Sequence, residues 1–420
     1  MWARWLLWLH DNIFYGWVIV AASLAIGLTN YGMRYSFGVF FNSIETEFYL
    51  SRAVTSGIFS AHMAISSIAS VLGGWALDRY GPRRLTFLMG ILTGLSLIMI
   101  SRAGSLWHLY FSYSFLLAFG TSPVFTVVNS TVSRWFDKRR GFALGISGAG
   151  NAAGTFIMAP FSAYLISAFD WRTAFLILAV ISWSIVTCMS VLLKKDPAEM
   201  GLLPDGAKPD VTRPARQDGQ GRKPGTGLSL TEAVRTANFW FLFMIWLLLS
   251  LSVHLLLTHI VPHAVDLGIE PMNAALILSL IGAASIAGRI VVGRISDTIG
   301  RKIPAVASAL VQAGALTFLI WTQDLWVFYL VAAIFGFSWG GLSSQVTVLV
   351  SDVFGMDDIG TIMGIIGVGW TIGAAIGPAV GGLVFDASRS YAGAFAFGAA
   401  NMLFATLIAA LIRTVPRRAE

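Results

Sequence analysis

The sequence contains few charged residues and a single cysteine. Only 12% of its 420 residues are Asp, Glu, Lys or Arg, about half the fraction of soluble globular domains. Hydrophobic residues make up 56%, and the mean hydropathy is +0.74. This composition excludes an ordinary soluble domain and favours a lipid solvent. Because Cys188 has no second cysteine to pair with, the fold cannot depend on internal disulfides.

Signatures of catalysis and of cofactor binding are also missing. The sequence has no HExxH, no Walker phosphate loop, no paired carboxylates within its apolar segments and no Cys/His metal cluster. We therefore expect neither an enzyme nor a bound cofactor or metal. A ligand-binding sensor that does not move its ligand is an alternative, although the linker and tails are short for a signalling domain.

Long apolar segments are abundant instead. A helix needs roughly 20 mostly apolar residues to cross a bilayer, and twelve segments meet this rule. We expect an all-α membrane protein with twelve transmembrane helices in two six-helix bundles, residues 1–193 and 237–420. The connecting stretch 194–236 is rich in Pro, Gly and charge and is interpreted as a flexible cytoplasmic linker. The predicted spans are 14–40, 54–77, 85–103, 106–133, 141–168, 172–193, 238–264, 271–295, 303–322, 325–351, 360–385 and 391–412.

The positions of Lys and Arg indicate the orientation. Cytoplasmic loops are enriched in basic residues, and all but six of the 28 fall in cytoplasmic loops, tails or helix ends when both termini are inside. The exceptions are Arg52, Arg102, Arg172 and Arg389 at or beyond the outer ends of spans, and Arg34 and Arg289 in the interior of spans. The net charge of +7 is therefore topogenic, which argues against a nucleic-acid partner. We expect a monomeric multi-pass protein of a bacterial inner membrane, with membrane lipid around it.

The two halves repeat a pattern of small residues and aspartate. The first half carries six such residues in two segments: Gly74, Asp78, Gly81, Gly141, Gly145 and Gly154. Their counterparts lie 219 positions later: Gly293, Asp297, Gly300, Gly360, Gly364 and Gly373. Parallel repeats of six helices indicate two bundles that rock about a central site near the middle of the membrane.

The repeated loop G-x-x-x-D-R-x-G-x-R-R after the second span is similar to the signature of the major facilitator superfamily. Other segments resemble its monocarboxylate porter branch, including bacterial oxalate/formate antiporter-like members. They are YGWVIVAA, YSFGVFF, SRWFDKRRGFALG, DPAEMGLLPDG and THIVPHAVDLG. The resemblance covers the whole chain and implies a secondary transporter of lactate-like or pyruvate-like monocarboxylates, coupled to protons, that works by alternating access. A formate/oxalate-type anion exchanger and an exporter of amphipathic compounds are the alternatives.

Charged residues of the repeated loops are candidates for gating. Asp78 and Asp297 hold the same place in the two halves, where a carboxylate can pair with a basic residue or cap a neighbouring helix. Such contacts form in one conformation and break in the other. The resemblance implies the same role, a latch for the outward-facing state. The basic residues of the predicted gates are Arg79, Arg83, Arg84, Arg134 and Arg301.

Arg289 is the strongest candidate for the substrate site. No Asp or Glu lies inside a predicted span, whereas Arg289 lies eight residues before Asp297, about 12 Å along a helix. A lone arginine at a helix centre costs roughly 3 kcal/mol, and a guanidinium binds a carboxylate through two hydrogen bonds. The alternative is an arginine that extends its head group to the inner interface. The resemblance implies the first role, because monocarboxylate porters bind substrate through an Arg at this position of the eighth span.

Two positions depart from the animal members of that branch. One helical turn before Arg289, where they carry an Asp implicated in proton coupling, this chain has Ser285. In the first span, Tyr35 replaces their lysine and stands next to Arg34. His259 fits best as a proton carrier and substrate contact, because histidine titrates near neutral pH. The other histidine candidates are His62, His254 and His263.

The remaining pocket residues come from the helices that line the cavity in this superfamily, the first, fourth, seventh and tenth. Their central parts offer Asn30, Tyr31, Phe125, Phe335 and Trp339. Aromatic walls suit a short aliphatic chain, and each of these side chains is equally compatible with packing or lipid contact. A single cation in the pocket suits a monocarboxylate better than a dicarboxylate. Because a bound anion neutralises Arg289, exchange or anion–proton symport is favoured over uniport.

Overall fold

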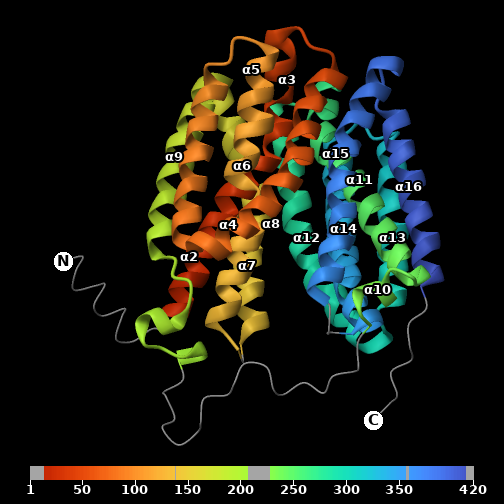
Figure 1. Ribbon diagram of the computed structural model, residues 1–420. Helices are drawn as coiled ribbons and strands as arrows, with labels where there is room; N and C mark the ends of the chain where they lie inside the picture. Colours follow the sequence, from red (N-terminus) through yellow and green to blue (C-terminus); the bar gives the residue numbers. More distant parts are fainter. Residues whose placement is uncertain (1–13, 138, 207–227, 356–358, 413–420) are drawn as a thin grey trace, which may run out of the picture. The chain divides into compact units, whose positions relative to one another are not determined.

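The computed structural model describes residues 14–137, 139–206, 228–355 and 359–412, and all regular elements in these ranges are helices (Figure 1). Both termini and residues 207–227 of the predicted linker lie outside the described residues. Eleven of the described helical segments are long and apolar enough to cross a membrane. One of them, α4 (Arg52–Ser101), has 50 residues and would be about 75 Å long if straight, more than twice the hydrocarbon core.

A backbone break divides α4 into two spans. Gly81 adopts φ 79° and ψ 167°, outside the helical region, directly before Pro82. A positive φ is readily adopted only by glycine, and the proline cannot donate to the preceding turn. The two arms of α4 correspond to the predicted second and third spans, so the all-α, twelve-span architecture is confirmed.

The other helices follow the predicted order. Those of the first half are α2 (Tyr15–Tyr35), α3 (Phe37–Phe48), α5 (Leu106–Leu109), the π-helical η1 (Tyr110–Leu116), α6 (Leu117–Thr121), α7 (Val124–Trp135), α8 (Arg140–Ala168) and α9 (Trp171–Leu192). Short segments follow: η2 (Pro197–Met200), η3 (Pro204–Gly206) and α10 (Leu230–Ala233). The second half contains α11 (Ala237–Asp266), α12 (Pro271–Ile299), α13 (Lys302–Leu319), α14 (Leu325–Phe354), α15 (Ile359–Ser388) and α16 (Ala392–Leu411).

Polar residues at the membrane boundary determine where several helices begin. The Asp170 carboxylate accepts hydrogen bonds from the backbone N–H groups of Arg172 and Thr173 at the start of α9. The Thr173 hydroxyl and these N–H groups lower the pKa of Asp170. Ser229 and Glu232 form a reciprocal capping box at α10, directly before α11. These caps satisfy N–H groups that the first turn of a helix leaves without partners.

Packing divides the described residues into two compact units. Unit 1 holds 14–34, 65–158 and 169–206, and unit 2 holds 35–64, 159–168 and the second half of the chain. This grouping differs from the division expected from chain order, because α3 and the beginning of α4 pack against α11 and α15 within unit 2. Each unit is described separately below.

The sequence repeat reappears as a repeat of close helix contacts. In unit 1, a Cβ added to Gly154 of α8 would lie 2.4 Å from the carbonyl oxygen of Leu28 in α2. In unit 2, a Cβ on Gly373 of α15 would lie 2.2 Å from the carbonyl oxygen of Leu247 in α11. Both residues of the second contact lie 219 positions after those of the first. Glycine at these sites lets the backbones approach, which is how membrane helices gain packing energy.

A second close contact fixes α12, the helix of Arg289. α12 runs beside α14 (Figure 1). A Cβ on Gly288 would lie 2.0 Å from the carbonyl oxygen of Phe337, and a Cβ on Gly340 would lie 2.0 Å from that of Ser285. Glycines on both helices thus face the partner backbone, so the rotation of α12 about its axis is constrained at the level of the candidate site.

Replacing Gly340 by alanine should therefore destabilise the protein. The added methyl group must push α12 and α14 apart, and overpacking of this kind costs about 1–3 kcal/mol. Gly314→Ala in α13 is the matched control, because a Cβ there meets nothing within 4 Å. Thermal unfolding of the detergent-purified variants measures the difference, and equal midpoints for the two variants would contradict this description of the packing.

Candidate substrate site and gates

Arg289 projects from α12 next to a tightly packed face of that helix. Its side chain is exposed, whereas the neighbouring Gly288 and Ser285 are buried against α14. Arg289 lies ten residues before Ile299, the last residue of α12, or about 15 Å from that end. The Ser285 hydroxyl donates to the Gly282 carbonyl at 2.8 Å. The serine hydroxyl thus has a partner within its own helix, one turn from the guanidinium.

The other predicted pocket residues of unit 2 are buried. Phe335 is 0% and Trp339 is 7% exposed, and both belong to α14. The indole Nε1 of Trp339 is buried without a hydrogen-bond partner among the described residues. Phe335 thus packs inside unit 2, and Trp339 keeps an unused donor.

The three predicted pocket residues of unit 1 differ from one another in burial. Asn30 is buried, its Nδ2 donates to the Ile26 carbonyl at 3.0 Å, and its Oδ1 has no partner among the described residues. Tyr31 is half-buried and packs against the apolar core around Val127. Phe125 is 63% exposed on α7. Asn30 Oδ1 is therefore a buried acceptor available to a donor.

His259 of α11 is enclosed in unit 2 and both ring nitrogens have neighbours. Nε2 lies 2.8 Å from the Pro378 carbonyl, and Nδ1 lies 3.1 Å from the Tyr391 hydroxyl. A carbonyl can only accept, so Nε2 carries a hydrogen and donates it to Pro378. Both ring nitrogens of His259 thus have a partner in this conformation.

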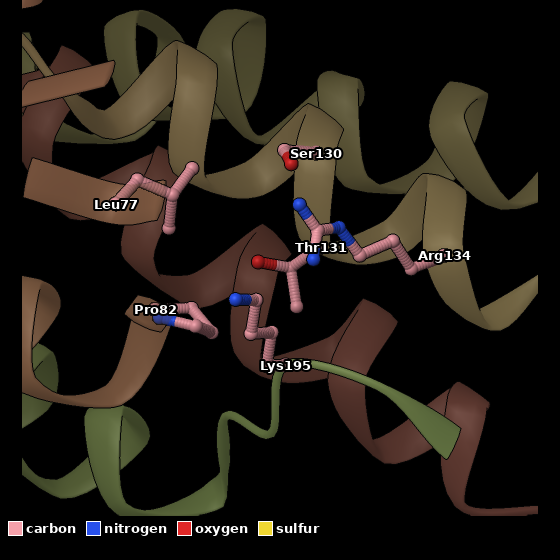
Figure 2. Close-up of a pocket in the computed structure, with 6 residues that line it drawn as sticks. All are labelled: Leu77, Pro82, Ser130, Thr131, Arg134 and Lys195. Atoms are coloured by element: carbon pink, nitrogen blue, oxygen red, sulfur yellow. The ribbon is translucent and has the colours of Figure 1, made fainter. Parts of the chain in front are cut away.

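In unit 1, the first predicted gate contains a long ion pair. The Arg134 Nη2 lies 3.8 Å from the Asp78 Oδ1. Arg134 also lines a shallow surface hollow, and Figure 2 shows its guanidinium and the Lys195 ammonium pointing into this hollow. Trp135 anchors the adjacent segment by donating from Nε1 to the Lys194 carbonyl at 3.1 Å. The hollow is lined by Leu77, Pro82, Ser130, Thr131, Arg134 and Lys195.

The remaining basic residues of that gate are not paired with acids in the same way. Arg79 lies over the ring of Trp75 at 5.5 Å, a cation–π contact. Arg83 and Arg84 are exposed and make no ion pair with any described residue.

The equivalent gate of unit 2 is more tightly paired. Arg301 Nη2 lies 2.6 Å from Asp297 Oδ1, and Arg301 Nε lies 3.7 Å from Asp352 Oδ2. The same guanidinium donates to the Ser296 hydroxyl. In both units the repeated aspartate thus faces an arginine of its own half.

A denser charged site lies elsewhere, at the start of α4. Arg52 makes two contacts with the Asp266 carboxylate, from Nη1 at 2.5 Å and from Nη2 at 2.6 Å. Its Nη1 also donates to the Tyr391 hydroxyl at 2.8 Å, and its Nε donates to Glu45 Oε1 at 3.2 Å. The Arg52 side chain is only 8% exposed.

The backbone at Arg52 is held by a further carboxylate. Asp386 Oδ1 accepts from the Arg52 N–H at 3.0 Å, and Oδ2 accepts from the Ala53 N–H at 2.9 Å. Asp386 of α15 therefore caps α4. The guanidinium also stacks on the ring of Phe385 at 3.9 Å. We call Glu45, Arg52, Asp266, Asp386 and Tyr391 the Arg52 cluster.

The sequence interpretation missed the Arg52 cluster. In the predicted topology, Arg52 is one of four basic residues on the outer side. Asp266 and Asp386 closely follow the ends of predicted spans. The separations in sequence are 214 residues to Asp266 and 334 residues to Asp386, so no local pattern connects them. The signal for this site in the sequence is Arg52 itself, because the predicted topology puts it on the outer side, where basic residues are rare.

The fold and the sequence both identify the family. The Major Facilitator Superfamily profile matches residues 23–373 and 266–420, and the chain belongs to this superfamily. It is a multi-pass integral membrane transporter rather than an enzyme.

Several monocarboxylate transporters are similar over most of their length. Monocarboxylate transporter 11 of Homo sapiens is 28% identical over 410 residues, which covers 94% of this chain and 82% of that protein. Monocarboxylate transporter 13 of Bos taurus is 26% identical over 391 residues, covering 93% and 87%. A crystal structure of a bacterial homologue of the human lysosomal transporter Spinster has a TM-score of 0.73 at 15% identity, with 95% of this chain and 96% of that chain covered. That likeness is one of fold.

A cysteine-accessibility test distinguishes a water-facing Arg289 from a lipid-facing one. In a Cys188→Ser background, Arg289→Cys should react rapidly with a charged, membrane-impermeant thiol reagent applied to both sides. Ile290→Cys is the control, because Ile290 is 65% exposed but points about 100° away around α12. Rapid labelling at 289 with slow labelling at 290 is expected, and equally slow labelling at both would place Arg289 in lipid.

Proposed function

We propose that this protein is a proton-coupled transporter of small monocarboxylates such as lactate or pyruvate, working by alternating access. The observation that carries the proposal is Arg289, exposed within the span α12 beside a glycine-packed face. The similarity to monocarboxylate transporters 11 and 13 supports the substrate class. The substrate carboxylate binds the guanidinium through two parallel hydrogen bonds.

The other predicted site residues have roles within their own units. In unit 2, the Trp339 Nε1 offers a donor for a substrate hydroxyl or keto group, and Phe335 offers apolar surface. In unit 1, the Asn30 Oδ1 offers an acceptor, and Tyr31 and Phe125 offer apolar surface. His259 is the proposed proton carrier, and Ser285 lies one helical turn before Arg289 on α12.

The charged loops at the predicted cytoplasmic side act as the inner gate. Asp78 with Arg134, and Asp297 with Arg301, hold the ends of their helices in place within each half. Both termini are proposed to lie on the same, cytoplasmic side, which agrees with the distribution of Lys and Arg. Arg79, Arg83 and Arg84 complete this surface of the first half.

Uptake of radiolabelled L-lactate into proteoliposomes under an inward proton gradient tests the proposal. Wild type should take up lactate, and Arg289→Ala should weaken its apparent affinity by roughly 30-fold or more, since losing one partner of a desolvated charge pair costs about 2–5 kcal/mol. Arg289→Lys should be intermediate, because an ammonium lacks the planar fork of a guanidinium.

Arg294→Ala is the matched control, as it removes a second arginine from the same helix. Unchanged uptake by Arg289→Ala would remove this residue from the mechanism. Absence of lactate uptake by the wild type would overturn the substrate proposal, and counterflow with formate or oxalate would then test for an exchanger.

A further inference from the structure

We infer that the Arg52 cluster is an outer gate whose closed form is stabilised by protonation of Glu45. Glu45 and Arg52 come from the first half of the chain, whereas Asp266, Asp386 and Tyr391 come from the second. The cluster therefore exists only when these helix ends meet, as they do in unit 2. The inference rests on alternating access by a transporter and is independent of the substrate.

The cluster is rich in negative charge. The cluster contains one guanidinium and three carboxylates, of which two are well compensated. Asp266 uses both oxygens on Arg52, and Asp386 uses both oxygens on N–H groups at the positive end of the α4 dipole. Glu45 makes a single contact at 3.2 Å, through Oε1 to the Arg52 Nε. It is the carboxylate whose charge the closed cluster compensates least.

The other polar groups around the cluster already have partners. His259 of α11 lies between the Pro378 carbonyl and the Tyr391 hydroxyl. The Tyr391 hydroxyl accepts from the Arg52 Nη1 at 2.8 Å. His263 packs among the rings of Phe328, Tyr391 and Phe395. The charged groups that act on Glu45 are Arg52, Asp266 and Asp386.

Closing the gate brings two further carboxylates toward the Glu45–Arg52 pair. Carboxylates that share a site resist simultaneous ionisation, so Glu45 binds a proton more readily in the closed form than in the open one. By linkage, a proton that prefers the closed form shifts the equilibrium toward it. The Arg52–Asp266 pair is untouched by this protonation and holds the gate together. Acid conditions therefore favour closure, and alkaline conditions favour opening.

A distance measurement across the gate tests this inference without any substrate. Tyr49 and Trp326, which are 95% and 79% exposed at this end of unit 2, are replaced by spin-labelled cysteines in a Cys188→Ser background. Pulsed electron–electron double resonance in lipid nanodiscs then measures the distance distribution between the two labels, which gives the open and closed populations. As the pH falls, the wild-type background should shift toward the shorter distance, and Glu45→Gln should remain closed with no pH response.

Two further variants make the result specific. Glu47→Gln removes a neighbouring exposed carboxylate of α3 and should retain the full pH response. Asp266→Asn removes the main partner of Arg52 and should increase the open population at every pH. A pH-independent distribution in the wild-type background, or an unchanged pH response in Glu45→Gln, would overturn the inference.

Discussion

The cost of an uncompensated charge in hydrocarbon is the constraint on which this structure depends. It explains why charged residues are scarce, and why those that remain are concentrated at helix ends. At one end of unit 2, five groups contact Arg52 or its backbone. The carboxylates of Asp266 and Glu45 compensate the charge of its guanidinium. Arg289 is exposed within a span, and the proposed substrate anion binds to it during transport.

Close helix packing places these charges. Glycines at equivalent positions of the two halves face backbone carbonyls of α2 and α11, and a separate set joins α12 to α14. Because lipid tails are as apolar as the side chains, such contacts supply the association energy that burial supplies in water. The rotation of α12 thereby directs Arg289 away from its packed face. The packing of small residues thus sets the direction in which the Arg289 side chain points.

Much of the fold was predictable, because spans, repeat and loop signature are local patterns. The join of the second and third spans through Gly81 illustrates this, since the GPRR segment already indicates a turn. The site was predictable only in part. The position of Arg289 within a span follows from the sequence, whereas the burial of Phe335 and the enclosure of His259 between Pro378 and Tyr391 arise from tertiary contacts. Asp266 and Asp386 lie more than 200 residues from Arg52 along the chain, so composition and periodicity could not predict these contacts.

Arg289 is proposed to bind a monocarboxylate, and ligand binding to the purified protein at equilibrium is the sharpest test of this role. Thermal unfolding is followed with and without L-lactate for the wild type and Arg289→Ala. A ligand at about 100 times its dissociation constant stabilises the folded state by about 2.7 kcal/mol, so the wild-type midpoint should rise with lactate concentration. The variant should fold normally and show no such rise. An equal lactate-dependent rise in both proteins would contradict the account, because the anion would then be bound without Arg289.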